Sequence, residues 1–127
     1  MAGTQRVDAR EVQAAFASGA TGGTLLERAA FRVNASRRDG AGEPEVHLRD
    51  TDIFYVLEGR ATVVTGGELV EPRVTGPGEI RGTDLRGGSE QRLGPGDVLT
   101  IPHGVPHWFR SVKPPFRYYV VKSVTGG

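Results

Sequence analysis

Residues 52–67, DIFYVLEGRATVVTGG, decide the fold class of this chain. The run is rich in β-branched and aromatic residues, which favour strands, and Glu58-Gly59 interrupts it. We expect residues 53–57 and 61–65 to form two strands joined by a tight hairpin turn at Glu58-Gly59. This stretch therefore predicts an all-β protein.

Strand-forming runs continue on both sides of this stretch. They read TLLERAAFRV, DVLTIP, HWFRSV and FRYYVVKSV, with Gly and Pro between nearly all of them. Residues 66–96 hold much of the glycine, and we expect turns and short edge strands there, with a disordered linker as the alternative. Many short strands in 127 residues predict one domain, built as a small sandwich or barrel.

A short helix is expected before the first strand, over about residues 9–18. Asp8 is a suitable N-cap, Glu11 stands three residues later as its capping-box partner, and Gly19 is a natural stop. We expect this helix to pack on the sheet as a lid or brace.

The strands carry apolar side chains on both faces. In residues 53–57, Phe54 and Val56 alternate with Tyr55 and Leu57, and residues 116–121 repeat the pattern. One face would fill the barrel, so the helix, a second sheet or another subunit must cover the other. A homodimer is the expected assembly.

Composition excludes several classes of function. The net charge is +1 and no basic stripe occurs, so we expect no nucleic-acid partner. The absence of cysteine excludes disulfides, thiolate metal sites and thiol nucleophiles. No apolar run has the length of a signal peptide or a membrane span, so the expected location is the cytoplasm, with no membrane partner.

The chain has three histidines, and two of them fall in a pattern typical of a metal site. Glu45 and His47 are two residues apart and would project to the same side of a strand. His107 begins a strand after the turn PHGVP, whereas His103 lies in that turn and is expected at the rim or surface. A histidine, a carboxylate and a second histidine can bind one divalent cation, although each could also be an ordinary core or surface residue.

Two spaced motifs make the chain resemble the cupin superfamily. The first spans residues 45–59 and the second residues 96–111. The matching positions are Glu45, His47, Asp52 and Gly59 in the first motif, and Gly96, Pro102, Gly104, His107 and Ser111 in the second. The resemblance implies a single jelly-roll β-barrel domain over residues 1–127, preceded by the short helix.

The resemblance also implies a metal site formed by Glu45, His47, Asp52 and His107. Cupins usually bind metal through two histidines and a glutamate of the first motif and a histidine of the second. Here Glu45 replaces the first histidine and Asp52 replaces the glutamate. The extra carboxylate favours iron(II), manganese, zinc or nickel. Asp52 would coordinate, act through a water, hold a histidine in place, or simply start a turn.

These residues lead to three hypotheses about function. The first is a metal-dependent enzyme that acts on a small oxygen-containing molecule inside the barrel, with Tyr118 or Tyr119 donating a proton at the barrel mouth. The second is a non-catalytic module that binds or senses a small ligand, with a degenerate metal site. The third is a metal-free, epimerase-like cupin, which would place an imidazole beside an aspartate with a tyrosine across the cavity.

Overall fold

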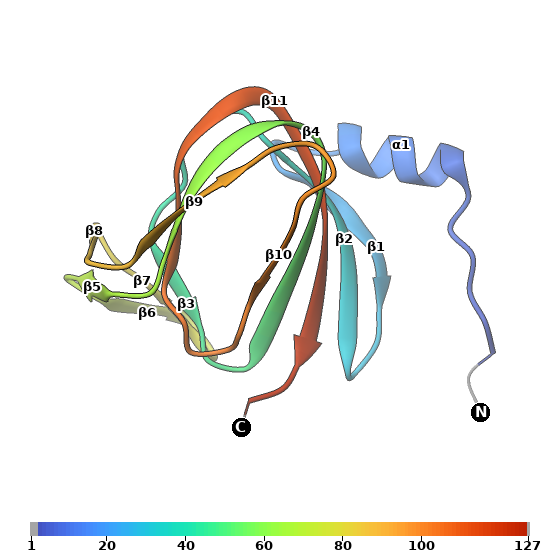
Figure 1. Cartoon of the computed structure of the whole chain (residues 1–127). Coiled ribbons are helices and arrows are strands. Elements are labelled where there is room, and N and C mark those ends of the chain that lie inside the picture. Colours follow the sequence, from blue (N-terminus) through green and yellow to red (C-terminus); the bar gives the residue numbers. More distant parts are fainter. Residues whose placement is uncertain (1–2, 127) are drawn as a thin grey trace.

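A computed structural model describes residues 3–126 as a β-barrel with one short helix (Figure 1). The all-β class and the jelly-roll barrel predicted from the sequence are confirmed. The elements in chain order are α1 (Ala9–Ala17), β1 (Gly22–Glu27), β2 (Phe31–Arg38), β3 (Glu45–His47), β4 (Asp50–Thr65), β5 (Glu68–Val70), β6 (Arg73–Gly76), β7 (Glu79–Arg81), β8 (Asp84–Arg86), β9 (Ser89–Leu93), β10 (Val98–Ile101) and β11 (His107–Val124).

A long antiparallel ribbon of β4 and β11 forms the centre of the barrel. The two strands pair from His107 opposite Thr65 to Val124 opposite Asp50. β2 pairs with the second half of β11, and β10 and β9 pair with the two halves of β4. β11 also pairs with β3, and β3 pairs in turn with β7, so the ribbon connects both ends of the barrel.

The hairpin expected at Glu58-Gly59 is wrong, because β4 runs through both residues without a turn. A two-residue hairpin needs a positive φ at both loop positions or glycine at the first, and glutamate at the first position satisfies neither. Gly59 instead has φ +84° and lies where β11 bulges, since Arg60 pairs with Lys113 and Glu58 with Arg117. The two halves of β4 therefore bend around the barrel and each pairs with other strands.

The core follows the alternation expected from the sequence. Phe54 and Val56 are buried, whereas Tyr55 and Leu57 are exposed on the outer face. The aromatic rings of the core pack against one another, with centroids 5.1 to 5.8 Å apart. They belong to Phe54, Phe109, Phe116 and Tyr118. This cluster fills one part of the barrel and leaves the rest to polar residues.

Helix α1 braces the outer face beside β1 and β2, as Figure 1 shows. The Asp8 side chain caps it by accepting from the Glu11 amide at 3.0 Å, and Gly19 follows its end with φ +59°. Phe16 is buried and packs on the ring of Tyr119, with centroids 5.6 Å apart. In residues 3–126 no helix is both long and apolar enough to cross a membrane.

The glycine-rich residues 66–96 form turns and short strands, as expected, and not a disordered linker. β5 pairs with β8 in a separate two-stranded sheet, while β6 and β7 extend the main sheet beyond β3. In Figure 1 these strands gather at the end of the barrel away from α1. This segment also contributes Glu79 of β7, whose carboxylate contacts the His47 ring.

Substituting Gly59 tests the close approach of β4 and β11. A Cβ at residue 59 would lie 2.2 Å from the Pro115 carbonyl oxygen, whereas one at Gly96, with φ +90°, would meet nothing within 4 Å. Both alanine substitutions carry backbone strain, so Gly96→Ala should lower the free energy of unfolding by about 1 kcal/mol and Gly59→Ala by about 3 kcal/mol. Urea denaturation measures both, and equal losses would contradict the close approach.

Candidate metal centre

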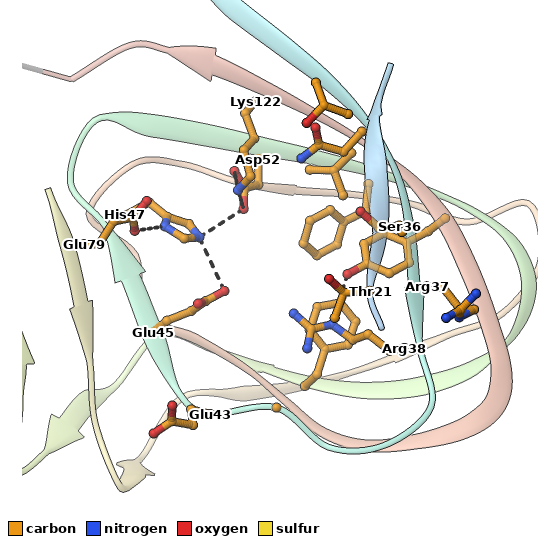
Figure 2. Close-up of a pocket in the computed structure, with 18 of the residues that line it drawn as sticks. Thr21, Ser36, Arg37, Arg38, Glu43, Glu45, His47, Asp52, Glu79 and Lys122 are labelled. Atoms are coloured by element: carbon orange, nitrogen blue, oxygen red, sulfur yellow. Dashed lines mark hydrogen bonds and ion pairs between the residues drawn. The ribbon is translucent and has the colours of Figure 1, made fainter. Parts of the chain in front are cut away.

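Cross-strand pairing brings three of the expected site residues together. Glu45 and His47 lie two residues apart on β3 and point to the same face, as the sequence predicts. His107, the first residue of β11, pairs directly with Glu45. Figure 2 shows Glu45 and His47 converging from β3 on one side of a cavity. The barrel thus joins the two sequence motifs at one point.

Two imidazole nitrogens face one carboxylate oxygen. Glu45 Oε1 lies 3.4 Å from His47 Nε2 and 3.3 Å from His107 Nε2. All three residues are largely buried, with His47 8% and His107 2% exposed. One ligand atom from each lies within 4.8 Å of the others. The three side chains therefore form a compact group of nitrogen and oxygen donors.

Contacts of the two Nδ1 atoms fix the tautomers of His47 and His107. His107 Nδ1 lies 3.1 Å from the Val105 carbonyl oxygen, which can only accept, so Nδ1 carries the proton. His47 Nδ1 contacts the carboxylate of Glu79, the β7 residue that lies opposite His47. This nitrogen likewise donates its proton to an acceptor. In the neutral rings both Nε2 atoms are then left with a lone pair, as in metal-ligating histidines.

These lone pairs make the residues fit a divalent cation. Within residues 3–126 neither Nε2 atom has a hydrogen-bond partner, although both are fully buried. Two nitrogen lone pairs and a carboxylate facing one another repel unless a positive charge lies between them, either a proton on a ring nitrogen or a metal cation. Bonds of about 2.0–2.1 Å in a tetrahedral site place ligand atoms about 3.3 Å apart, which agrees with the two distances to Glu45. Glu45, His47 and His107 would hold such an ion.

The site also favours the ionised form of its acid. Burial alone would raise the pKa of Glu45, but the imidazoles of His107 and His47 outweigh it and hold that pKa well below its usual range. Burial alone would lower the pKa of His47, but Glu45 and Asp52 raise it above its ordinary value. Glu45 is therefore a carboxylate at neutral pH, which is the form that binds a metal.

Asp52 lies beside the site and forms an ion pair with the Lys122 ammonium. It is 2% exposed, and its Oδ2 lies 3.4 Å from His47 Nε2. Both carboxylate oxygens also accept from the Lys122 ammonium, at 3.0 and 3.1 Å. Lys122 is its direct cross-strand neighbour on β11. The ion pair balances charge beside the site, and the roles considered for Asp52, as a ligand, through a water or in holding a histidine in place, stay predictions.

The centre opens into a cavity of about 720 Å³ inside the barrel. Tyr118 lines this cavity and is buried, and burial raises the pKa of its hydroxyl, so it keeps its proton at neutral pH. Tyr119 points to the opposite face of β11 and packs on α1, so the structure does not bring it to the cavity. Of the two tyrosines expected to act there, only Tyr118 is in position.

His103 lies at the rim, as expected. It is exposed, and its Nδ1 lies 3.0 Å from the Thr125 hydroxyl, away from the three-residue centre.

Sequence reasoning missed three polar residues of the cavity. Lys122 has the same strand parity as Tyr118, so the alternation could have revealed it. Arg38 and Glu79 gave no such signal, because their positions depend on the pairing of β2 with β11 and of β3 with β7.

The comparisons with known proteins agree with this architecture. The sequence model of the family described as Cupin matches residues 6–127. The search of curated proteins found no significant match.

Three solved structures illustrate the similarity of fold. KdgF from Halomonas sp. has a TM-score of 0.58 and 22% identity, over 80% of this chain and 77% of that one. Pac13 from Streptomyces, described as a nucleoside dehydratase, has a TM-score of 0.55 and 10% identity, over 80% and 66%. The DMSP lyase DddQ from Ruegeria pomeroyi DSS-3 has a TM-score of 0.53 and 20% identity, over 76% and 39%. At these identities the likeness shows the fold alone.

Removing the Glu79 charge tests how His47 is held. Without that acceptor the His47 ring loses its orientation and basicity, so Glu79→Gln should weaken zinc binding by about tenfold. Glu68→Gln removes the same charge at an exposed residue of β5 and should leave the zinc affinity unchanged. Competition with a chromophoric chelator measures both, and equal affinities in the two variants would contradict this role of Glu79.

Proposed function

The chain belongs to the cupin family, and we propose that it is a metal-dependent enzyme acting on a small oxygen-containing organic molecule held in the barrel. Glu45, His47 and His107 would hold the ion, which is iron(II), manganese, zinc or nickel according to the mixed nitrogen and oxygen donors. A bound divalent ion would supply Lewis acidity towards a carbonyl or enolate oxygen, or activate water or dioxygen.

One observation carries this proposal: the buried Nε2 atoms of His47 and His107 face the Glu45 carboxylate and have no hydrogen-bond partner in the described part of the chain. A buried polar atom without a partner costs about 1–3 kcal/mol. Both rings are held so that these atoms, and not the Nδ1 atoms, meet at Glu45. Such an arrangement supports a ligand-binding role better than a structural one.

The cavity residues suggest how a substrate would be handled. Tyr118 accepts a hydrogen bond from Arg38 at 3.0 Å, which leaves its O–H free to donate to a substrate oxygen. Its raised pKa keeps the hydroxyl protonated at neutral pH, which suits a hydrogen-bond donor to the substrate. The Lys122 ammonium pairs with the Asp52 carboxylate beside His47 and adds a donor to the cavity wall.

A metal-free reaction is the second candidate, because part of its expected geometry is present. His47 Nε2 lies 3.4 Å from Asp52 Oδ2, and Tyr118 lines the same cavity. In that case His47 and Asp52 would exchange a proton with the substrate, and chelators would leave the activity unchanged.

Homodimer formation and a cytoplasmic location stay predictions. Exposed apolar residues on the outer face, Tyr55 of β4 and Val98 of β10, are direct cross-strand neighbours and support a paired outer surface.

Metal content tests the proposal. Protein purified without chelator and reconstituted separately with Fe²⁺, Mn²⁺, Zn²⁺ and Ni²⁺ should bind about one ion per chain. Glu45→Gln and His107→Ala should lose it, whereas Asp52→Asn should retain it, because Asp52 is already paired with Lys122. Elemental analysis after gel filtration gives the stoichiometry, and circular dichroism checks the fold of each variant.

Two results would contradict these assignments. Failure of the wild-type protein to bind any of the four ions would exclude the metal-dependent function. Loss of metal in Asp52→Asn equal to that in Glu45→Gln would make Asp52 a ligand.

A further inference from the structure

We propose that Arg38 forms an anion subsite in the same cavity and binds a carboxylate group of the substrate. This inference rests on the proposed function, since it names the substrate class: a small carboxylic acid that carries a further oxygen function. Arg38 ends β2 and lines the cavity together with Glu45 and His47. Figure 2 shows it on the β2 side of the cavity, away from the β3 residues.

Arg38 is the cavity cation whose charge no acid balances. Four cationic side chains line the cavity, and three have a carboxylate nearby. These pairs are Arg37 with Asp39 at 3.7 Å, Arg81 with Glu45 at 3.4 Å, and Lys122 with Asp52 at 3.0 Å. Within residues 3–126, no carboxylate oxygen lies within 4.0 Å of the Arg38 guanidinium nitrogens. The cavity therefore has one positive charge available to a ligand.

The guanidinium is held in place by neutral groups. It stacks over the Phe109 ring, 4.1 Å from the centroid, and its Nε donates to Tyr118 Oη at 3.0 Å. These contacts use one face of the planar guanidinium and its Nε–H group. They leave the edge formed by its two terminal nitrogens for a ligand. A preorganised guanidinium loses little conformational freedom when it binds an anion.

Gly42 makes room for this position of Arg38. Its amide donates to the Phe109 carbonyl at 3.0 Å, and its carbonyl accepts from Trp108 Nε1 at 2.7 Å, so its backbone is fixed. A Cβ at residue 42 would lie 2.7 Å from Arg38 Nη1. An alanine there would displace the guanidinium while keeping its charge.

The chemistry of the subsite favours a carboxylate over a phosphate. A guanidinium edge matches the two oxygens of a carboxylate, and one free positive charge balances a monoanion. A phosphate monoester carries about −1.5 to −2 charges at neutral pH and would need a second unpaired cation. The other cavity cations already have carboxylate neighbours.

Binding of simple carboxylates to metal-free protein tests this subsite separately from the metal centre. Chelator-treated full-length protein is titrated with glycolate and lactate, with their neutral amides glycolamide and lactamide, and with inorganic phosphate, and ligand-observed NMR gives the dissociation constants. The wild-type protein should bind each acid at least about tenfold more tightly than its amide. Equal binding of acid and amide, or tighter binding of phosphate, would overturn the proposal.

Matched variants assign the effect to Arg38. Arg38→Gln should weaken carboxylate binding by about tenfold or more and leave amide binding unchanged. Gly42→Ala should also weaken it without removing a charge. Arg92→Gln, at a side chain that is 84% exposed and does not line the cavity, removes the same charge and should behave as wild type. Wild-type affinity in Arg38→Gln or Gly42→Ala would overturn the proposal.

The metal content of the same proteins separates the two proposals. Arg38→Gln should bind as much zinc as wild type, because among the described residues the ion pairs of Glu45 within 4.0 Å involve His47, Arg81 and His107 and not Arg38. Carboxylate binding that depends on Arg38 in a protein unable to bind metal would contradict only the proposed function. Metal binding without such carboxylate binding would contradict only the subsite.

Discussion

The need for a positive charge among three buried groups is the constraint on which the rest of the site depends. The Nε2 atoms of His47 and His107 face the ionised Glu45 carboxylate at 3.4 and 3.3 Å, and among the described residues neither atom has a hydrogen-bond partner. The barrel fixes this arrangement from outside, because Glu79 and the Val105 carbonyl accept the Nδ1 protons and so turn the lone pairs inward. A cation at the centre of the group converts the repulsion into attraction.

The cavity separates its charges into two regions. On one side, Lys122 is paired with Asp52 next to the histidines, so the acids near the centre are partly balanced. On the other side, Arg38 is fixed by Phe109 and Tyr118 and has no acid partner within the described chain. A substrate with an oxygen function at one end and a carboxylate at the other would satisfy both regions. Tyr118, which carries its proton, lies beside the Arg38 region.

Local features of the sequence, namely strand alternation and spaced motifs, could be predicted, whereas the long-range pairing of strands could not. Strand alternation put Phe54 and Val56 on one face of β4, which proves to be the inner one, and the two motifs selected Glu45, His47 and His107, which the fold brings together. The hairpin at Glu58-Gly59 failed, because the sequence does not show that β11 bulges opposite Gly59 and that β4 continues past it. Glu79 and Arg38 were missed for the same reason, since each reaches the cavity through long-range register. Asp52 was expected at the site and lies beside His47, but its ion pair with Lys122 was not foreseen.

X-ray absorption spectroscopy of the zinc-loaded protein tests the central claim most directly, because it reports the atoms bound to the ion. The structure predicts a first shell of nitrogen and oxygen at about 2.0–2.2 Å, with the outer-shell scattering of two imidazole rings. His107→Ala should reduce that signal to one ring. A spectrum with no imidazole scattering, or one that His107→Ala leaves unchanged, would show that the ion does not bind between Glu45, His47 and His107.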